Sequence, residues 1–138
     1  MKKQVASSPV LATKPGKMVK SITKNGASDL QNKMIAEAFK RCGIDCVTTF
    51  EAESGWRGDA KNTKNRNGTY DIGECQLNSQ YHLKFIKSEA FKDPWNRLNY
   101  CLDVWDDAKR RNRLSTTWYA FAVRNTPGVI KRFTIVYE

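Results

Sequence analysis

Apolar residues recur at the three-and-four-residue spacing of helices along most of the chain, and this pattern predicts a protein built mainly from short helices. The first predicted helix covers residues 29–42, with Ser28 as its N-cap and Gly43 as the residue that ends it. A second, shorter helix is expected over residues 45–55. Further helices are expected over residues 81–91, 94–113 and 128–137, with a short one that begins at Ser115.

Residues 57–70 break this pattern, because they are polar, contain glycine and have no helical period. Within them Asn67-Gly68 is a strong hairpin signal, and residues 69–78 are the best strand candidate. Together these elements predict an α+β fold that is dominated by helices. One small β-hairpin is inserted after the second helix.

The N-terminal residues 1–27 contain six lysines, no acidic residue and scattered apolar positions without a period. We expect a flexible basic arm here and a folded domain over residues 28–138. A secretory signal needs an apolar central stretch, and residues 5–12, with two serines and a proline, are too polar to form one. The sequence also has no apolar run of the ~18 residues that a membrane span needs.

The composition limits the kinds of partner and active site that the chain can have. The chain has 138 residues, the size of one domain, and its formal net charge of +10 predicts an anionic partner. The chain has one histidine, His82, so we do not expect a histidine-based triad or a multi-histidine zinc site. We interpret His82 as a surface residue. We predict no metal and no cofactor. Because no export signal is clear, we expect reduced, buried cysteines in preference to disulfides at Cys42, Cys46, Cys75 and Cys101.

Two carboxylates occupy the positions that define a cleft. Glu53 lies at the end of the second helix, and Asp71 lies in the hairpin that follows. A helix end that faces a hairpin places one carboxylate on each wall, which is the arrangement that glycosidic bond cleavage requires. Glu51 lies two residues before Glu53 and points away from it on a helix, so we expect Glu51 to face solvent.

Three short segments carry a family resemblance. The first, Glu53-Ser54-x-Trp56, is similar to the E-S-x-F signature of c-type lysozymes and lytic transglycosylases. Residues 68–79, G-T-Y-D-I-G-x-x-Q-L-N-S, resemble the c-type pattern G-S-T-D-Y-G-x-x-Q-I-N-S. Residues 117–121 and Arg124-Asn125 are similar to the c-type segment A-W-x-A-W and the R-N after it. The resemblance covers about residues 28–130 and implies the lysozyme superfamily, with a hairpin beside an active-site cleft.

This resemblance assigns roles to individual residues. Glu53 would be the general acid, with Trp118 as the apolar neighbour that raises its pKa, and Asp71 would be the ionised second carboxylate. Glu74 departs from the apolar residue that the family usually has at that position, and adds a third carboxylate near the cleft. The residues implied in substrate binding are Ser54, Gln76, Asn78, Tyr81, Trp118 and Asn125.

The implied function is cleavage of the peptidoglycan glycan strand at the β-1,4 bond between N-acetylmuramic acid and N-acetylglucosamine, by a muramidase or a lytic transglycosylase. The match at Asp71 favours the hydrolase, because a transglycosylase uses a single glutamate. A small chain without a clear signal peptide suits a bacteriophage or mobile element. It would act in the periplasm or cell wall, delivered by a virion, a holin or a secretion machine. Expected partners are therefore peptidoglycan and virion or secretion-machine proteins.

A second hypothesis is non-enzymatic. The chain could be a catalytically inactive, lysozyme-like structural or interaction protein of a virion, with the basic arm binding nucleic acid. No helix-turn-helix, zinc-finger or ribonucleoprotein motif is present, so nucleic acid is not the expected partner. A relic would be expected to have lost Glu53 or Gln76, and this chain keeps both, which favours the enzyme.

Overall fold

The computed structural model describes residues 17–138, and residues 1–16 of the predicted basic arm lie outside the described part. The longest element is α1, Asp29–Ser54. It begins behind Ser28, whose hydroxyl accepts from the Gln31 backbone in a capping box, and its backbone leaves the helical conformation at Gly43, where φ is 75°. The two helices predicted on either side of Gly43 are thus confirmed as two parts of one interrupted element.

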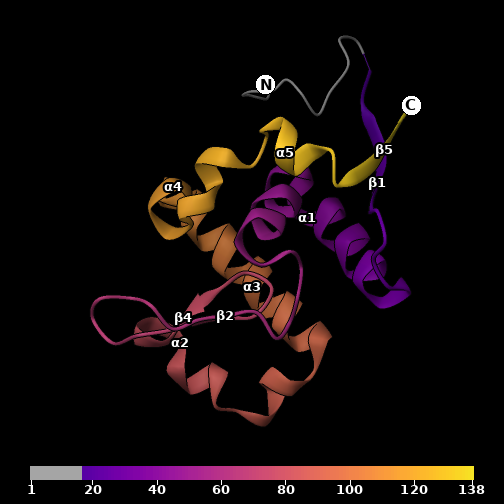
Figure 1. Ribbon diagram of the computed structural model, residues 1–138. Coiled ribbons are helices and arrows are strands. Elements are labelled where there is room, and N and C mark those ends of the chain that lie inside the picture. Colours follow the sequence, from indigo (N-terminus) through magenta and orange to yellow (C-terminus); the bar gives the residue numbers. More distant parts are fainter. Residues whose placement is uncertain (1–16) are drawn as a thin grey trace.

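The core forms where α1 packs against α3, Pro94–Arg110. The predicted N-cap and first residue of α3 are confirmed, since the Asp93 side chain accepts from the Trp95 backbone and Pro94 opens the helix. Figure 1 shows the two helices side by side at the centre of the molecule. Their contact buries a cluster of aromatic rings that comprises Phe50, Trp56, Trp105 and Trp118.

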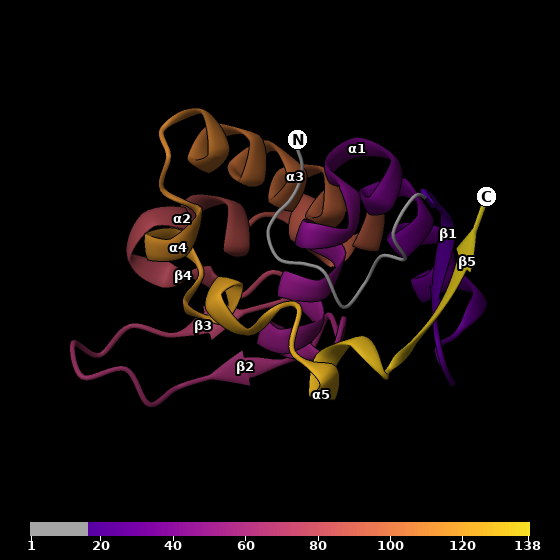
Figure 2. The same cartoon turned by 90° about the horizontal axis from the view of Figure 1, so that it is seen from above.

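A three-stranded antiparallel sheet stands beside this core, in the order β2 (Lys61–Asn62), β3 (Asp71–Ile72), β4 (Leu77–Asn78). The expectation of one strand over residues 69–78 is wrong. The chain reverses between β3 and β4, where Gly73 has a φ of 89° and Gln76 a φ of 55°. Figure 2 shows the loop between β2 and β3 projecting away from the helices.

The remaining helices are short. The chain between β4 and α3 forms a helix that begins two residues earlier than predicted, because Asn78 caps it, and then a 3-10 turn. After α3, which ends three residues earlier than predicted, come three single turns. In chain order these elements are α2 (Ser79–Ile86), η1 (Glu89–Lys92), α4 (Leu114–Thr117), η2 (Tyr119–Val123) and α5 (Pro127–Ile130).

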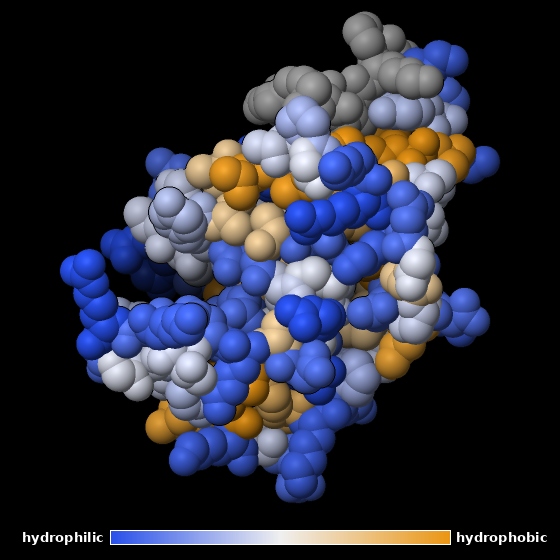
Figure 3. Space-filling model, viewed as in Figure 1, coloured by the Kyte–Doolittle hydropathy of each residue, from blue (hydrophilic) through white to orange (hydrophobic). Residues whose placement is uncertain are grey.

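The two ends of the described chain form a second sheet, in which β1 (Val19–Lys24) pairs antiparallel with β5 (Phe133–Tyr137). Two expectations are therefore wrong: the basic arm is not flexible as far as residue 27, and residues 128–137 are not one helix. Residues 133–137 alternate inward and outward in the strand, and the sheet buries Ile22 and Phe133. Figure 3 shows mostly hydrophilic side chains on the viewed face, with apolar ones gathered near this sheet.

The cysteines form two disulfides, Cys42–Cys46 and Cys75–Cys101. The prediction of reduced thiols is wrong: Cys42 and Cys46 pair across the interruption of α1 at Gly43, and the fold brings Cys75 next to Cys101, 26 residues later in the chain. The second bond joins the turn between β3 and β4 to the middle of α3. The hairpin is thereby held covalently against the core.

Glu51 is also placed differently from the prediction. It is 3% exposed, and its carboxylate pairs with Lys24 at 3.0 Å and with Arg132 at 3.2 Å. The helix face that carries Glu51 is covered by the β1–β5 sheet. The sequence pattern predicts no strand in either segment, since it places residues 19–24 in an arm and residues 133–137 in a helix. The solvent-facing assignment of Glu51 is therefore wrong, and this carboxylate ties the terminal sheet to α1.

The fold class is confirmed as α+β and dominated by helices. Within residues 17–138, no helix combines the length and the apolar character needed to cross a membrane.

Candidate active site

Glu53 lies in the last turn of α1 and is half-buried. Its neighbour Gly55 takes the left-handed conformation that ends the helix, with a φ of 65°. The backbone N–H of Ala120, in η2, donates a hydrogen bond of 3.1 Å to Glu53 Oε2. Residues from opposite ends of the domain thus hold this carboxyl group in place.

The surroundings of Glu53 favour its neutral form. Burial raises the pKa of the Glu53 carboxyl, and the negative charge of Asp71 raises it further. The hydrogen bond from Ala120 acts in the opposite direction, but the pKa remains above its usual value. A carboxylic acid with a raised pKa retains its proton to higher pH, which is the property of a general acid.

Asp71 has a different environment, made of amide donors. Asn62 and Asn65 donate to its Oδ2 at 3.2 and 3.1 Å, and Asn78 donates to its Oδ1 at 2.8 Å. The strand register creates two of these contacts, because Asp71 lies opposite Asn62 on one side and Asn78 on the other. Asn62 and Asn65 are not among the predicted site residues, because the polar pattern of residues 57–70 predicts only loops and turns. The available signal was the cluster of asparagines at positions 62, 65 and 67 shortly before Asp71.

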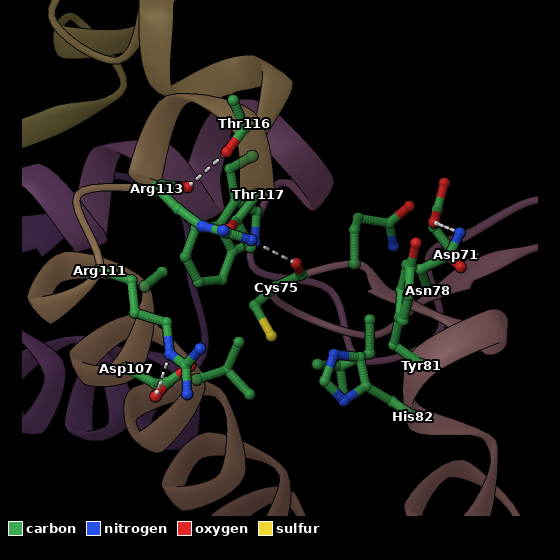
Figure 4. A pocket seen from close by; sticks show the side chains of 15 residues that line it. Asp71, Cys75, Asn78, Tyr81, His82, Asp107, Arg111, Arg113, Thr116 and Thr117 are labelled. Atoms are coloured by element: carbon green, nitrogen blue, oxygen red, sulfur yellow. Dashed lines mark hydrogen bonds and ion pairs between the residues drawn. The ribbon is translucent and has the colours of Figure 1, made fainter.

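A cavity of about 540 Å³ opens between the hairpin and the end of α3. That volume is within the range of small-ligand sites. Figure 4 shows side chains from β3, β4 and α2 on one side of the cavity, and side chains from α3 and α4 on the other. Five of the predicted site residues line the cavity, and they are Asp71, Gln76, Asn78, Tyr81 and Trp118.

The polar residues of the hairpin also hold its shape. Gln76 Nε2 donates to the carbonyl oxygens of Ala60 and Gly73, both at 2.9 Å, and so closes the tight turn. Asn78 both donates to Asp71 and accepts from the Gln80 backbone at the start of α2. These contacts fix the wall of the cavity before any ligand arrives.

Two aromatic residues line the cavity in different ways. Tyr81 is 75% exposed, so its ring is free to stack on a ligand. Trp118 is 3% exposed, packs on Phe50 and Trp105, and donates from Nε1 to the Cys75 carbonyl oxygen at 2.7 Å. Trp118 therefore belongs to the core and to the cavity wall at once.

Ser54, predicted to contact substrate, is instead buried within the protein. Its hydroxyl donates its single proton to the Glu74 carbonyl oxygen at 2.5 Å, lies 3.1 Å from the Phe50 carbonyl oxygen, and accepts from the Trp56 backbone at 3.0 Å. The hydroxyl joins the end of α1 to the β3–β4 turn. Ser54 thus positions the hairpin relative to Glu53.

Asn125 does not line the cavity. It is half-buried after η2, and its Oδ1 is a buried acceptor without a hydrogen bond from the described residues. The preceding Arg124 donates to Asp45 at 2.8 Å and lies 3.7 Å from the centre of the Phe121 ring. This segment therefore packs against α1 rather than against the cavity.

Glu74 and His82 also differ from expectation. Glu74 is 3% exposed and makes a two-bond ion pair with Arg97, at 2.9 and 3.0 Å, so it is not a third carboxylate of the cleft. His82 lines the cavity, is half-buried, and its Nδ1 lies 2.8 Å from the Tyr100 hydroxyl. Because His82 is half-buried on the cavity wall, its assignment to the surface is wrong, and this burial lowers its pKa.

Except for Trp118, the residues on the cavity wall opposite the hairpin were not among the predicted site residues. The basic cluster Lys109-Arg110-Arg111-Asn112-Arg113 lies at the end of α3, and the fold turns Arg111 and Arg113 toward the cavity. The cavity residues from this wall are Val104, Asp107, Ala108, Arg111, Arg113, Thr116 and Thr117. Over residues 17–138, histidine, cysteine and acidic side chains do not gather in a group that could hold a metal ion.

Comparison of the chain with protein-family models, with curated proteins and with solved structures finds no match. The function is therefore argued from the site itself.

Proposed function

We propose that this protein has a lysozyme-like fold and cleaves the glycan strand of peptidoglycan at the β-1,4 bond between N-acetylmuramic acid and N-acetylglucosamine. The observation that carries the proposal is the pairing of two unlike carboxyl groups. Glu53 is half-buried and has a raised pKa. Asp71 is held by three amide donors, and its negative charge raises the pKa of Glu53 further. Carboxyl groups with divergent environments define the acid and its anionic partner in glycosidases.

In this proposal Glu53 protonates the oxygen of the scissile bond. Proton transfer makes the departing sugar a neutral alcohol while positive charge develops on the sugar carbon that is left behind. The carboxyl group of Glu53 is oriented for this step by the Ala120 N–H, which donates a hydrogen bond to Oε2. After the transfer, this hydrogen bond stabilises the carboxylate.

Asp71 lines the cavity, which Glu53 does not, and supplies the negative charge there. A carboxylate that accepts from three side-chain amides has a fixed orientation, and it stabilises or attacks the positively charged sugar carbon. The cavity beside it offers the exposed ring of Tyr81 for stacking on a sugar. The side-chain nitrogens of Gln76 and Asn78 already donate within the hairpin, so these two residues support the site by fixing the position of Asp71 and the shape of the turn.

The charge and the disulfides support the same setting. A net charge of +10 attracts an anionic polymer at long range. Two disulfides suit an oxidising compartment such as the periplasm or the cell wall. We propose that a virion, a holin or a secretion machine of a bacteriophage or mobile element delivers the protein there.

The first test replaces the proposed acid. Glu53→Gln keeps the size of the side chain and removes its titratable proton, so lysis of purified peptidoglycan should fall by at least ~10²-fold. The matched control is Glu37→Gln, at an exposed position on the same helix, which should retain full activity. Circular dichroism checks that both variants fold. A fully active Glu53→Gln variant would show that another group donates the proton, and an inactive wild type would favour the non-enzymatic hypothesis.

The second test separates hydrolysis from transglycosylation. Mass spectrometry of digested peptidoglycan distinguishes reducing ends, made by hydrolysis, from 1,6-anhydromuramyl ends, made when the sugar's own hydroxyl closes the ring. We expect reducing ends, and we expect Asp71→Asn to lower the rate by at least ~10²-fold because the negative charge is lost. Anhydro ends together with an active Asp71→Asn variant would favour a single-glutamate transglycosylase.

A further inference from the structure

The end of α3 folds in a way that brings an arginine to the cavity. Asn112 takes the left-handed conformation, with a φ of 55°, and reverses the chain after the last helical turn. The Arg113 backbone N–H then donates to the Ala108 carbonyl oxygen at 2.8 Å, across the end of the helix. This reversal places the Arg113 side chain on the cavity wall instead of on the next turn of a helix.

The charges near this helix end are unequally paired. Asp107 accepts ion pairs from Arg110 at 3.2 Å and from Arg111 at 3.1 Å. In the described part of the chain, the guanidinium of Arg113 has neither an ion pair nor a hydrogen bond. The cavity wall therefore carries one cation without an internal counter-ion, and Arg111 lies beside it.

This arginine faces the proposed catalytic wall across the cavity. Figure 4 shows Arg111 and Arg113 on one side, with Asp71, Asn78 and Tyr81 on the other. A ligand that fills the cavity therefore meets amide and carboxylate groups on the hairpin and guanidinium groups on the far wall. Such a ligand is polar along one edge and anionic along the other.

Stabilisation of the end of α3 explains the positions of only some of the arginines at residues 110–113. Cations in the last turn of a helix interact favourably with its dipole, and this accounts for Arg110 and Arg111. Arg113 lies beyond the reversal at Asn112, outside that last turn. Its position on the cavity wall thus needs a different explanation.

We infer that Arg113, with Arg111 beside it, binds a carboxylate carried by the substrate, and that it makes the site selective for carboxylate-bearing glycan strands over neutral ones. The inference rests on the proposed function. In peptidoglycan every second sugar carries a lactyl group, which ends in a carboxylate or extends into a peptide that has its own carboxylates. A guanidinium binds a carboxylate through two parallel, charge-assisted hydrogen bonds. A homopolymer of N-acetylglucosamine has no such group.

The test compares Arg113→Gln with Arg110→Gln on three substrates. These are peptide-bearing strands, strands stripped of peptides so that the lactyl carboxylate is free, and an N-acetylglucosamine hexamer. The wild type should prefer the carboxylate-bearing strands, and Arg113→Gln should lower that preference in kcat/KM by about tenfold, mainly through KM. Arg110→Gln, at the end of α3 and outside the cavity, should keep the wild-type preference.

The substrates also identify the carboxylate. A loss of preference on stripped strands assigns the contact to the lactyl group, and a loss only on peptide-bearing strands assigns it to the peptide. An unchanged preference, or an equal loss on all three substrates, overturns the inference. If the wild type cleaves none of them, the proposed function fails. Calorimetric binding of the peptide-bearing and the stripped strands then decides separately, because wild type and Arg113→Gln binding equally to both kinds of strand overturns the role of Arg113.

Discussion

Glu51 and Glu53 are two residues apart on α1, and their neighbours give them different roles. Glu51 faces Lys24 and Arg132, which come from the two ends of the described chain. Glu53 instead faces the Ala120 N–H and the negative charge of Asp71. The helical period correctly predicts that the two side chains point apart. It could not predict which side is covered, because the covering strands are distant in sequence.

The raised pKa of Glu53 leads to a prediction about stability. A group whose pKa is higher in the folded than in the unfolded state stabilises the fold fully below its unfolded pKa, and that contribution is lost as pH rises through the folded pKa. Ionisation of Glu53 in the folded protein therefore lowers the free energy of unfolding, and a glutamine at this position avoids that loss. Urea unfolding should show Glu53→Gln gaining stability relative to the wild type between pH 4 and pH 7.

The exposed Glu37→Gln variant is the control for this measurement, and its difference from the wild type should stay nearly constant over the same pH range. A pH-independent difference for Glu53→Gln would mean that burial does not perturb this carboxyl in solution.

At the scale of elements, the sequence predicts best where local chemistry decides. Ser28, Gly43 and Asp93 mark helix boundaries correctly, because caps and left-handed residues act within a few positions. The terminal sheet could not be predicted in this way. Residues 133–137 are too few to distinguish a strand from a helix by periodicity, and their partners are residues 19–24 at the other end of the described chain.

The β1 strand should therefore be needed for stability. A chain that begins at Ser28 lacks Ile22, which is 2% exposed, and leaves the buried Glu51 without Lys24. We expect this truncation to lower the free energy of unfolding by on the order of 3 kcal/mol or more. The control is a chain that begins at Lys17, which keeps the whole strand. Equal urea midpoints for the two chains would show that β1 contributes nothing to the fold.

At the scale of the whole molecule, the candidate site assembles from segments that the sequence keeps apart. The motif residues Asp71, Gln76 and Asn78 could be found because they lie within one short hairpin. Asn65 and Arg113 could not, since each reaches the site through a loop or helix end whose path depends on the tertiary fold. Sequence patterns thus locate the proposed reacting groups. The walls that surround them require the folded chain.

The Glu74–Arg97 ion pair limits which residues can replace Gly58. A Cβ added at Gly58 would meet Arg97 Nη2 and would lie 2.9 Å from Glu74 Oε2. The guanidinium cannot move aside easily, because it also donates to the Phe91 carbonyl oxygen at 2.8 Å, and its departure would leave Glu74 buried without a counter-ion. Position 58 is thus closed to every larger side chain, although its own backbone needs no left-handed conformation. The restriction at position 58 therefore comes from the guanidinium of Arg97 in α3, which occupies the space that a side chain at position 58 would need.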